Sequence, residues 1–320
     1  MILKTTYIAL HESPRTQSLP AKLNIETLKL PEIGNIYKSL RLTSVKKVYR
    51  FYNQLNSNGQ LILEYDGNFI PVLTCAFVNI FKSKKFKIIL DCHVNSYLDV
   101  RLFSPRTFFK LFLIYFYKNI LGYKILVHNK SSLKLIKRSH YCPSPFPVDA
   151  INLTYIKPNS IFIISSLNKD EPVDAFIDAA IELEKHGFDI KISGNFSKLT
   201  DEQIYKGKSF FTGFLEKTDY FKHIMKSEIV ISMTTRKYNL LFAPREALGY
   251  KKICLINDSN ENKEFYSSLC LYSSHESASI VSHVLKISEN PPVFNESDYK
   301  NLINEVNIQI KNIKKCLHIN

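Results

Sequence analysis

The segment from Glu228 to Asp258 has residue types and spacing that suit the binding of a nucleotide. An apolar strand at residues 229–231 leads into a short helix, predicted to begin near Asn239, that carries Glu246. Such a helix N-terminus leaves backbone N–H groups free above the sheet, and the helix dipole favours an anion there. A carboxylate further along the helix can accept hydrogen bonds from ribose hydroxyls. A plain β–α–β crossover with a surface glutamate is the alternative interpretation.

Other residues near this helix could hold the phosphates and the base. Arg236 precedes the predicted helix, and the backbone N–H groups of Asn239 and Leu240 would add donors for an anion. Gly213 would let the backbone approach a ligand closely, and Phe214 could pack against a base, although a plain turn also explains both residues. Together these residues form a predicted site for a nucleotide that bears phosphates and a sugar.

The N-terminal half offers a second set of polar residues. Asp91 and His93 follow a buried strand predicted at residues 86–90. Because histidine can act as a general base near neutral pH or bind a hydroxyl, these two are the candidate catalytic residues. A structural histidine is the alternative. Arg15, at a loop–helix junction, could hold an anionic acceptor or a phosphate, or it could pair with an acid in a structural role.

Alternating strands and helices must position these residues, and the hydrophobic pattern predicts them along the whole chain. In the N-terminal half, strands are predicted at 5–10, 25–30, 60–65, 86–90 and 124–128, with helices at 18–23, 43–55, 69–81, 107–120 and 131–139. In the C-terminal half, strands are predicted at 161–165, 189–192, 210–212, 229–231, 252–258 and 269–272, with helices at 173–186, 200–206, 218–225, 239–249, 277–287 and 299–314. This alternation predicts an α/β protein with two Rossmann-like, doubly wound domains.

Three prolines between Cys142 and Pro147 cannot continue a helix or a central strand, so a domain boundary is predicted there. The prediction is an N-terminal domain at 1–147, a C-terminal domain at 148–298 and a terminal helix at 299–320. Ligands of such folds bind at the carboxyl ends of the strands. The sequence therefore predicts an inter-domain cleft.

The chain has a net charge of +14, and all of this excess lies in residues 1–150, which hold 22 Lys and Arg against 8 Asp and Glu. This asymmetry is typical of a half that faces nucleic acid, an anionic membrane or a phosphorylated substrate, although a lysine-rich composition without a partner also explains it. The six cysteines have no C-x-x-C spacing, which predicts reduced thiols in a cytosolic protein. We expect no signal peptide and no membrane-spanning helix.

Residues 108–117, FFKLFLIYFY, are apolar almost all round a helix and too few to span a bilayer. They predict either a buried core helix or a surface that meets lipid beside a cationic domain.

The order of elements resembles a GT-B glycosyltransferase, and the C-terminal half is similar to glycosyltransferase family 4. The segments that carry this resemblance are Phe211-Thr212-Gly213-Phe214, residues 220–225, 228–232 and 166–172, and Pro244-Arg245-Glu246-Ala247-Leu248-Gly249-Tyr250. Residues 13–19 and 89–93 resemble segments of bacterial polysaccharide-assembly members. The resemblance covers most of the chain, but each motif is short.

This resemblance implies transfer of a hexose from a nucleotide-diphosphate sugar to a glycan acceptor, polyprenyl-linked, with a peripheral contact at the cytoplasmic face of a membrane, in surface polysaccharide biosynthesis. It implies that Glu246 binds ribose hydroxyls and that Lys169 meets the donor diphosphate as a point charge, with a solvated loop lysine as the alternative. Many retaining members carry a second glutamate eight positions before the one that matches Glu246. Tyr238 stands there in this chain, which leaves open the donor sugar, the stereochemical outcome and whether the chain is active.

No Asp-x-Asp motif occurs in the sequence, so no metal is predicted, and cations and helix N-termini would stabilise the leaving diphosphate. No cofactor is expected beside the nucleotide-sugar co-substrate. Three alternatives stay open: a non-catalytic GT-B partner subunit, a sugar-nucleotide epimerase and a basic nucleic-acid-binding protein. Because no known nucleic-acid-binding motif is visible, no nucleic acid is expected among the partners.

Overall fold

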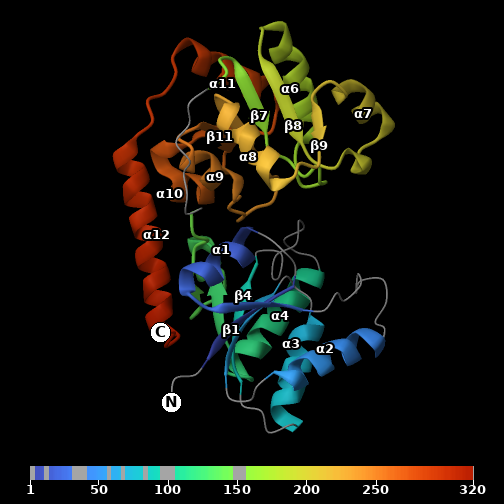
Figure 1. Ribbon diagram of the computed structural model, residues 1–320, viewed down its shortest axis with the longest axis vertical. Coiled ribbons are helices and arrows are strands. Elements are labelled where there is room, and N and C mark those ends of the chain that lie inside the picture. The colour runs from blue at the N-terminus through green and yellow to red at the C-terminus, as the bar shows by residue number, and fades with distance from the viewer. Residues whose placement is uncertain are drawn as a thin grey trace. The chain divides into compact units, whose positions relative to one another are not determined.

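The computed structural model describes residues 4–10, 14–30, 42–55, 59–65, 69–81, 86–93, 105–146 and 156–319. Its contacts divide the chain into two compact units, Met1–Pro145 with Glu305–Asn320, and Phe146–Asn304. The boundary predicted between residues 147 and 148 lies outside the described residues. Each unit contains a six-stranded parallel sheet with flanking helices (Figure 1), which confirms the predicted α/β class with two doubly wound sheets.

The first sheet has the strand order β2-β1-β3-β4-β5-β6. Its strands are β1 (Thr5–Ala9), β2 (Glu26–Lys29), β3 (Gln60–Tyr65), β4 (Lys87–Cys92), β5 (Lys124–Val127) and β6 (His140–Tyr141). The central strands β1 and β3 are buried from end to end, as expected for a parallel sheet with helices on both faces. The strand order reverses between β1 and β3, where folds of this class bind ligands at the carboxyl ends of the strands.

Helices cover both faces of this sheet. They are α1 (Pro14–Leu23), α2 (Leu42–Gln54), α3 (Phe69–Phe81), α4 (Pro105–Asn119), α5 (Lys130–Leu135) and the last part of α12 (Glu296–Cys316). The β1–α1–β2 connection runs toward one edge of the sheet, and the later connections run toward the other. Right-handed crossovers therefore place α1 on one face and α2, α3 and α4 together on the opposite face (Figure 1).

The second sheet has the strand order β12-β11-β10-β7-β8-β9. Its strands are β7 (Ser160–Ile163), β8 (Asp189–Ser193), β9 (Phe211–Gly213), β10 (Ile229–Ser232), β11 (Ile253–Asn257) and β12 (Leu271–Ser273). Counted from β7, this is the Rossmann strand order, and it reverses between β7 and β10. The carboxyl ends of these two strands are therefore the expected place for a ligand in this unit.

The helices of the second unit form where the sequence has apolar residues at helical spacing or a capping residue. They are α6 (Val173–Lys185), α7 (Asp201–Gly207), α8 (Lys217–Lys226), α9 (Ala243–Gly249), α10 (Asn260–Tyr266) and α11 (Ser277–Glu289). Apolar residues at helical spacing, such as Phe176 and Leu183 of α6 and Ile280 and Val284 of α11, pack into one core against the sheet. A capping box at Thr200 fixes the start of α7.

The structure differs from the sequence-based expectation at two helices of the second unit. The helix expected from Asn239 begins only at Ala243, because Pro244 would interrupt a helix over 239–249 and instead occupies the first turn of α9. The short helix α10 was not predicted, although Ser259 caps it by accepting a hydrogen bond from the backbone N–H of Asn262.

Candidate functional site

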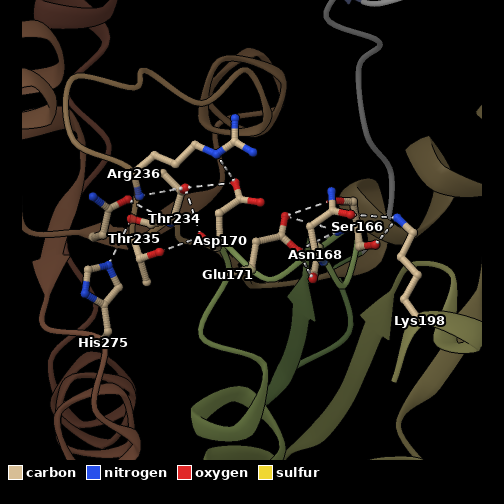
Figure 2. A network of polar contacts seen from close by, with 11 residues as sticks. Ser166, Asn168, Asp170, Glu171, Lys198, Thr234, Thr235, Arg236 and His275 are labelled. Atoms are coloured by element: carbon tan, nitrogen blue, oxygen red, sulfur yellow. Dashed lines mark hydrogen bonds and ion pairs between the residues drawn. The ribbon is translucent and has the colours of Figure 1, made fainter. Parts of the chain in front are cut away.

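The loops that follow β7 and β10 meet where the order of the second sheet reverses. Arg236 Nε lies 2.7 Å from Asp170 Oδ2 in an ion pair. The backbone N–H of Thr235 donates to the Asp170 carbonyl at 2.7 Å, and Thr234 Oγ1 donates to the same oxygen at 3.0 Å. His275 Nε2 lies 3.0 Å from the Thr234 carbonyl oxygen. Figure 2 shows how these contacts hold the two loops against each other.

The carboxylate of Glu171 organises the loop after β7. It accepts hydrogen bonds from Ser165 Oγ at 2.6 Å, from Ser166 N and Oγ at 3.0 Å each, and from Asn168 N at 3.1 Å. Lys198 Nζ donates to the Ser166 carbonyl at 3.0 Å and to Asn168 Oδ1 at 2.9 Å (Figure 2). Charge-assisted bonds of this kind are the strong ones, so they hold the loop in one conformation.

Lys169, the predicted diphosphate partner, is exposed in this same loop. Its neighbours Asn168 and Asp170 both belong to the polar network, and Asp170 is the partner of Arg236. The structure therefore brings the loops of Lys169 and Arg236 together at the carboxyl ends of β7 and β10. Two cations on adjoining loops can face one anion.

Glu246 lies in the first turn of α9, after β10, and is 8% exposed. Its Oε2 accepts a hydrogen bond of 2.5 Å from the hydroxyl of Tyr220 on α8. Burial raises the pKa of Glu246, while the bond from Tyr220 and the charge of Lys217 lower it less strongly. The surface glutamate of the alternative interpretation is thus not what the structure shows. One oxygen has a protein partner, and the carboxylate as a whole is held in a partly apolar environment.

The other predicted nucleotide contacts lie on separate loops of the unit. Gly213 ends β9 with a φ of 79°, which suits glycine, and its carbonyl accepts a hydrogen bond from Gly194 N at 3.0 Å. Phe214 is 84% exposed. Asn239 and Leu240 are half-buried in the loop that precedes α9, so their N–H groups do not belong to a helix N-terminus.

In the first unit, Arg15 and Asp91 form a buried ion pair. Arg15 donates from Nε to Asp91 Oδ2 at 2.9 Å and from Nη2 to Asp91 Oδ1 at 2.7 Å. Tyr7 OH donates to Oδ2 at 2.7 Å, and His128 Nε2 lies 3.1 Å from Oδ1. Despite its burial, Arg15 and His128 hold the pKa of Asp91 well below its usual range. Arg15 therefore has an acidic partner, as its structural interpretation required.

His93 lies beside this cluster at the end of β4. Its Nε2 is 3.0 Å from Glu64 Oε1, and its ring meets the ring of His128 edge-on at 4.8 Å. Glu64 Oε2 also accepts a hydrogen bond of 2.6 Å from the backbone N–H of Leu10. Burial lowers the pKa of His128 to about 3. Two imidazoles, each with Nε2 near a buried carboxylate, thus lie at the carboxyl ends of neighbouring strands.

Tyr7, Glu64 and His128 of this cluster were not predicted from the sequence. Glu64 and His128 carry one available signal: each is a polar residue at the end of an apolar strand, in QLILEY and next to KILV. Asp170, Glu171 and Tyr220 were missed in the second unit. Their partners lie elsewhere in the chain or across a loop, and spacing alone does not reveal such pairs.

Similar solved structures share this architecture. HepE from Anabaena, solved in complex with UDP and glucose, has a TM-score of 0.68 at 10% identity over 98% of this chain and 99% of its own. A glycosyltransferase from Rickettsia africae has a TM-score of 0.67 at 12% identity, covering 98% and 97%. A putative UDP-N-acetylglucosamine 2-epimerase from Listeria monocytogenes has a TM-score of 0.57 at 11% identity, covering 98% and 95%. The chain has the GT-B fold. No protein-family model and no curated protein matches its sequence.

The described residues were also compared with the requirements of a metal site and of a membrane-spanning helix. Within the described ranges, no group of three or more His, Cys, Asp and Glu side chains is placed to hold a metal ion. Over the same residues, no helix is both long and apolar enough to cross a bilayer.

Proposed function

We propose that this chain is a glycosyltransferase of the family 4 type that moves a hexose from a nucleotide-diphosphate sugar to a glycan acceptor. One observation carries the proposal: the loops after β7 and β10 are joined by the Asp170–Arg236 ion pair, at the strand reversal where Rossmann units bind nucleotides. The buried carboxylate of Glu246 lies in the first turn of the helix that follows β10. In this proposal the β10–loop–α9 segment supplies a phosphate-binding arginine and a ribose-binding carboxylate, and the loop after β7 adds Lys169.

The proposed roles follow from the chemistry of each group. Arg236 engages Asp170 through Nε, so its two Nη atoms can meet the diphosphate, with Lys169 as a second cation. Positive groups placed there stabilise the charge that develops as the nucleotide diphosphate leaves, without a metal ion. Oε1 of Glu246 can accept a bond from a ribose hydroxyl while Tyr220 binds Oε2. Gly213 and Phe214 would border the base.

In the first unit, we propose that His93 reaches the transferred sugar or the acceptor hydroxyl. Its side chain is 22% exposed, whereas Asp91 is fully buried with both oxygens engaged. Asp91 would therefore act through His128 and Arg15, which it holds in place, and not by touching a substrate. Arg15 is likewise 4% exposed, so its proposed contact with a phosphate would require a change of partner.

The acceptor is proposed to be a glycan linked to a polyprenyl lipid, within the synthesis of a surface polysaccharide. The excess of +14 in residues 1–150 supports an anionic, lipid-linked diphosphate as the substrate of the first unit. Such an acceptor would bring the protein to the cytoplasmic face of a membrane.

A non-catalytic partner subunit is the second candidate, and Tyr238 favours it. This residue stands where many retaining members carry a glutamate, and its backbone has a φ of 61°. A partner subunit would bind a nucleotide and turn over no sugar with any acceptor. An epimerase would instead act on the nucleotide-sugar alone.

A thermal-shift screen against UDP, GDP, ADP and CMP and their sugar conjugates tests the proposal. A ligand at one hundred times its Kd stabilises the native state by about 2.7 kcal/mol. We expect one nucleoside diphosphate to raise the melting temperature of the wild type. Glu246→Ala should lose most of this shift, whereas Glu202→Ala, which removes an exposed helix glutamate, should keep it. Equal shifts in both variants would overturn the assignment of the donor site.

A further inference from the structure

The third and fourth helices of the first unit carry large exposed apolar side chains. On α3, these are Leu73, Phe77 and Ile80, which are 38%, 50% and 67% exposed. On α4, Phe108, Phe109, Phe112 and Tyr115 are 51–62% exposed. Both sets recur at helical spacing, so each forms a stripe along its helix. The described part of α4 is thus not the fully buried core helix that was one interpretation of its sequence.

These stripes lie on one face of the first sheet. Right-handed crossovers place α2, α3 and α4 on the same face, and Figure 1 shows them there together. The rings of Tyr49 on α2 and Phe77 on α3 meet edge-on at 6.4 Å. Helices α2 and α3 therefore form a continuous surface, and α4 follows on the next connection of the sheet. We call the exposed side of these three helices the aromatic face.

The charges of the aromatic face decide what kind of partner it fits. The sequences of the three helices contain no aspartate or glutamate, and α2 carries three cations. Lys46, Lys47 and Arg50 are exposed on α2, beside Tyr49. A protein partner of ordinary composition, or a second copy of this face, would not match a cationic surface without carboxylates. An anionic bilayer matches both the cations and the aromatic rings.

We propose that the aromatic face docks on the surface of a membrane that contains anionic lipid. The phenylalanine rings of α3 and α4 would enter the boundary between headgroups and acyl chains, and the cations of α2 would meet the lipid phosphates. The biological role of this docking rests on the proposed function, because it would bring the protein to a lipid-linked acceptor. The surface itself is independent of the nucleotide site.

Vesicle co-sedimentation of the full chain tests this docking. The probes are vesicles of phosphatidylcholine with about 30% phosphatidylglycerol, compared with pure phosphatidylcholine. We expect binding to the anionic vesicles that weakens steeply with salt. The double substitution Phe108→Gln with Phe112→Gln should weaken binding at least about tenfold, because two phenylalanine side chains no longer enter the bilayer. Lys46→Glu with Lys47→Glu should weaken it about fivefold or more for each charge.

The matched control is Phe196→Gln with Tyr205→Gln, which removes two exposed aromatic side chains from the second unit and should leave vesicle binding unchanged. All changed side chains are at the surface, so unchanged melting temperatures will show that each variant is folded. Wild-type protein that ignores anionic vesicles, or an aromatic-face variant that binds as well as the wild type, would overturn the proposal. So would a dimer that the Phe108 and Phe112 substitutions dissociate, since the face would then cover a second copy. The nucleotide-induced thermal shift should persist in every variant, so a failure of docking is distinct from a failure of the donor site.

Discussion

Arg236 Nε lies 2.7 Å from Asp170 Oδ2, and this ion pair joins the loops that follow the two strands at which the second sheet reverses its order. The pair places the Arg236 guanidinium beside a carboxylate of the other loop. A planar guanidinium can hold a carboxylate through one edge and still present N–H donors to a phosphate through another.

Removal of the Arg236 side chain should therefore weaken the binding of a nucleoside diphosphate. We expect Arg236→Ala to raise its Kd about tenfold or more, as expected for the loss of a charged hydrogen-bond donor. Titration calorimetry of the nucleotide that stabilises the wild type measures this. Arg138→Ala, on the first unit, is the control and should bind normally; a normal Kd in Arg236→Ala would remove this residue from the site.

Replacement of Glu246 by glutamine should separate stability from binding. Burial raises the pKa of Glu246, so the folded state disfavours the ionised form: this group contributes stability below its unfolded pKa of about 4.3, and that contribution is lost as pH rises through its folded pKa. Glu246→Gln keeps an acceptor for Tyr220 and removes the buried charge. We expect its melting temperature at pH 7.5 to exceed that of the wild type by about 2 °C or more, and its nucleotide affinity to fall. A variant that is less stable and binds normally would contradict both expectations.

Loss of Arg15 should destabilise the first unit strongly. Arg15→Ala would leave the Asp91 carboxylate fully buried without its bidentate partner. Breaking a buried ion pair on one side costs about 3–5 kcal/mol, which urea denaturation monitored by circular dichroism can measure. Lys4→Ala, which breaks the exposed pair with Glu26, should change the free energy of unfolding by less than about 1 kcal/mol. A similarly small change in the free energy of unfolding in both variants would show that the buried cluster contributes little to stability.

Acid should destabilise the protein partly through His128. Because burial lowers the pKa of His128 to about 3, the unfolded chain binds its proton more readily, and stability present above about pH 6.5 is lost as pH falls toward 3. Asp91, whose pKa is also lowered, adds a loss at still lower pH. Urea denaturation between pH 7 and 4 should show that the free energy of unfolding changes less with pH in His128→Gln than in the wild type. His186→Gln, an exposed control, should follow the wild type.

The alternation of strands and helices was predictable because apolar periodicity directly encodes buried strands and half-buried helices. Glu246 was predicted as a helical carboxylate after β10, and the structure places it there. The start of that helix was predicted too early, since Pro244 would interrupt a longer helix and occupies the first turn of α9. These local features were visible in the sequence only as residue types, not as dihedral angles.

The partners of the site residues could not be predicted, because they are brought together by the fold. Asp91 meets Arg15 from 76 residues away, and Tyr220 meets Glu246 from 26 residues away. Exposure was equally hidden: an aromatic helix such as α4 has the same sequence pattern whether its outer side meets the core, lipid or water. The resemblance to a family supplied a role for Glu246 but did not reveal the Asp170–Arg236 pair.

Amide hydrogen exchange with and without the stabilising nucleoside diphosphate tests the central claim most directly. Binding at the strand reversal should slow exchange in residues 165–171, 233–241 and 243–250, with little change in α2, α3 and α4. Protection confined to other parts of the chain, with these three segments unchanged, would contradict the proposed nucleotide site.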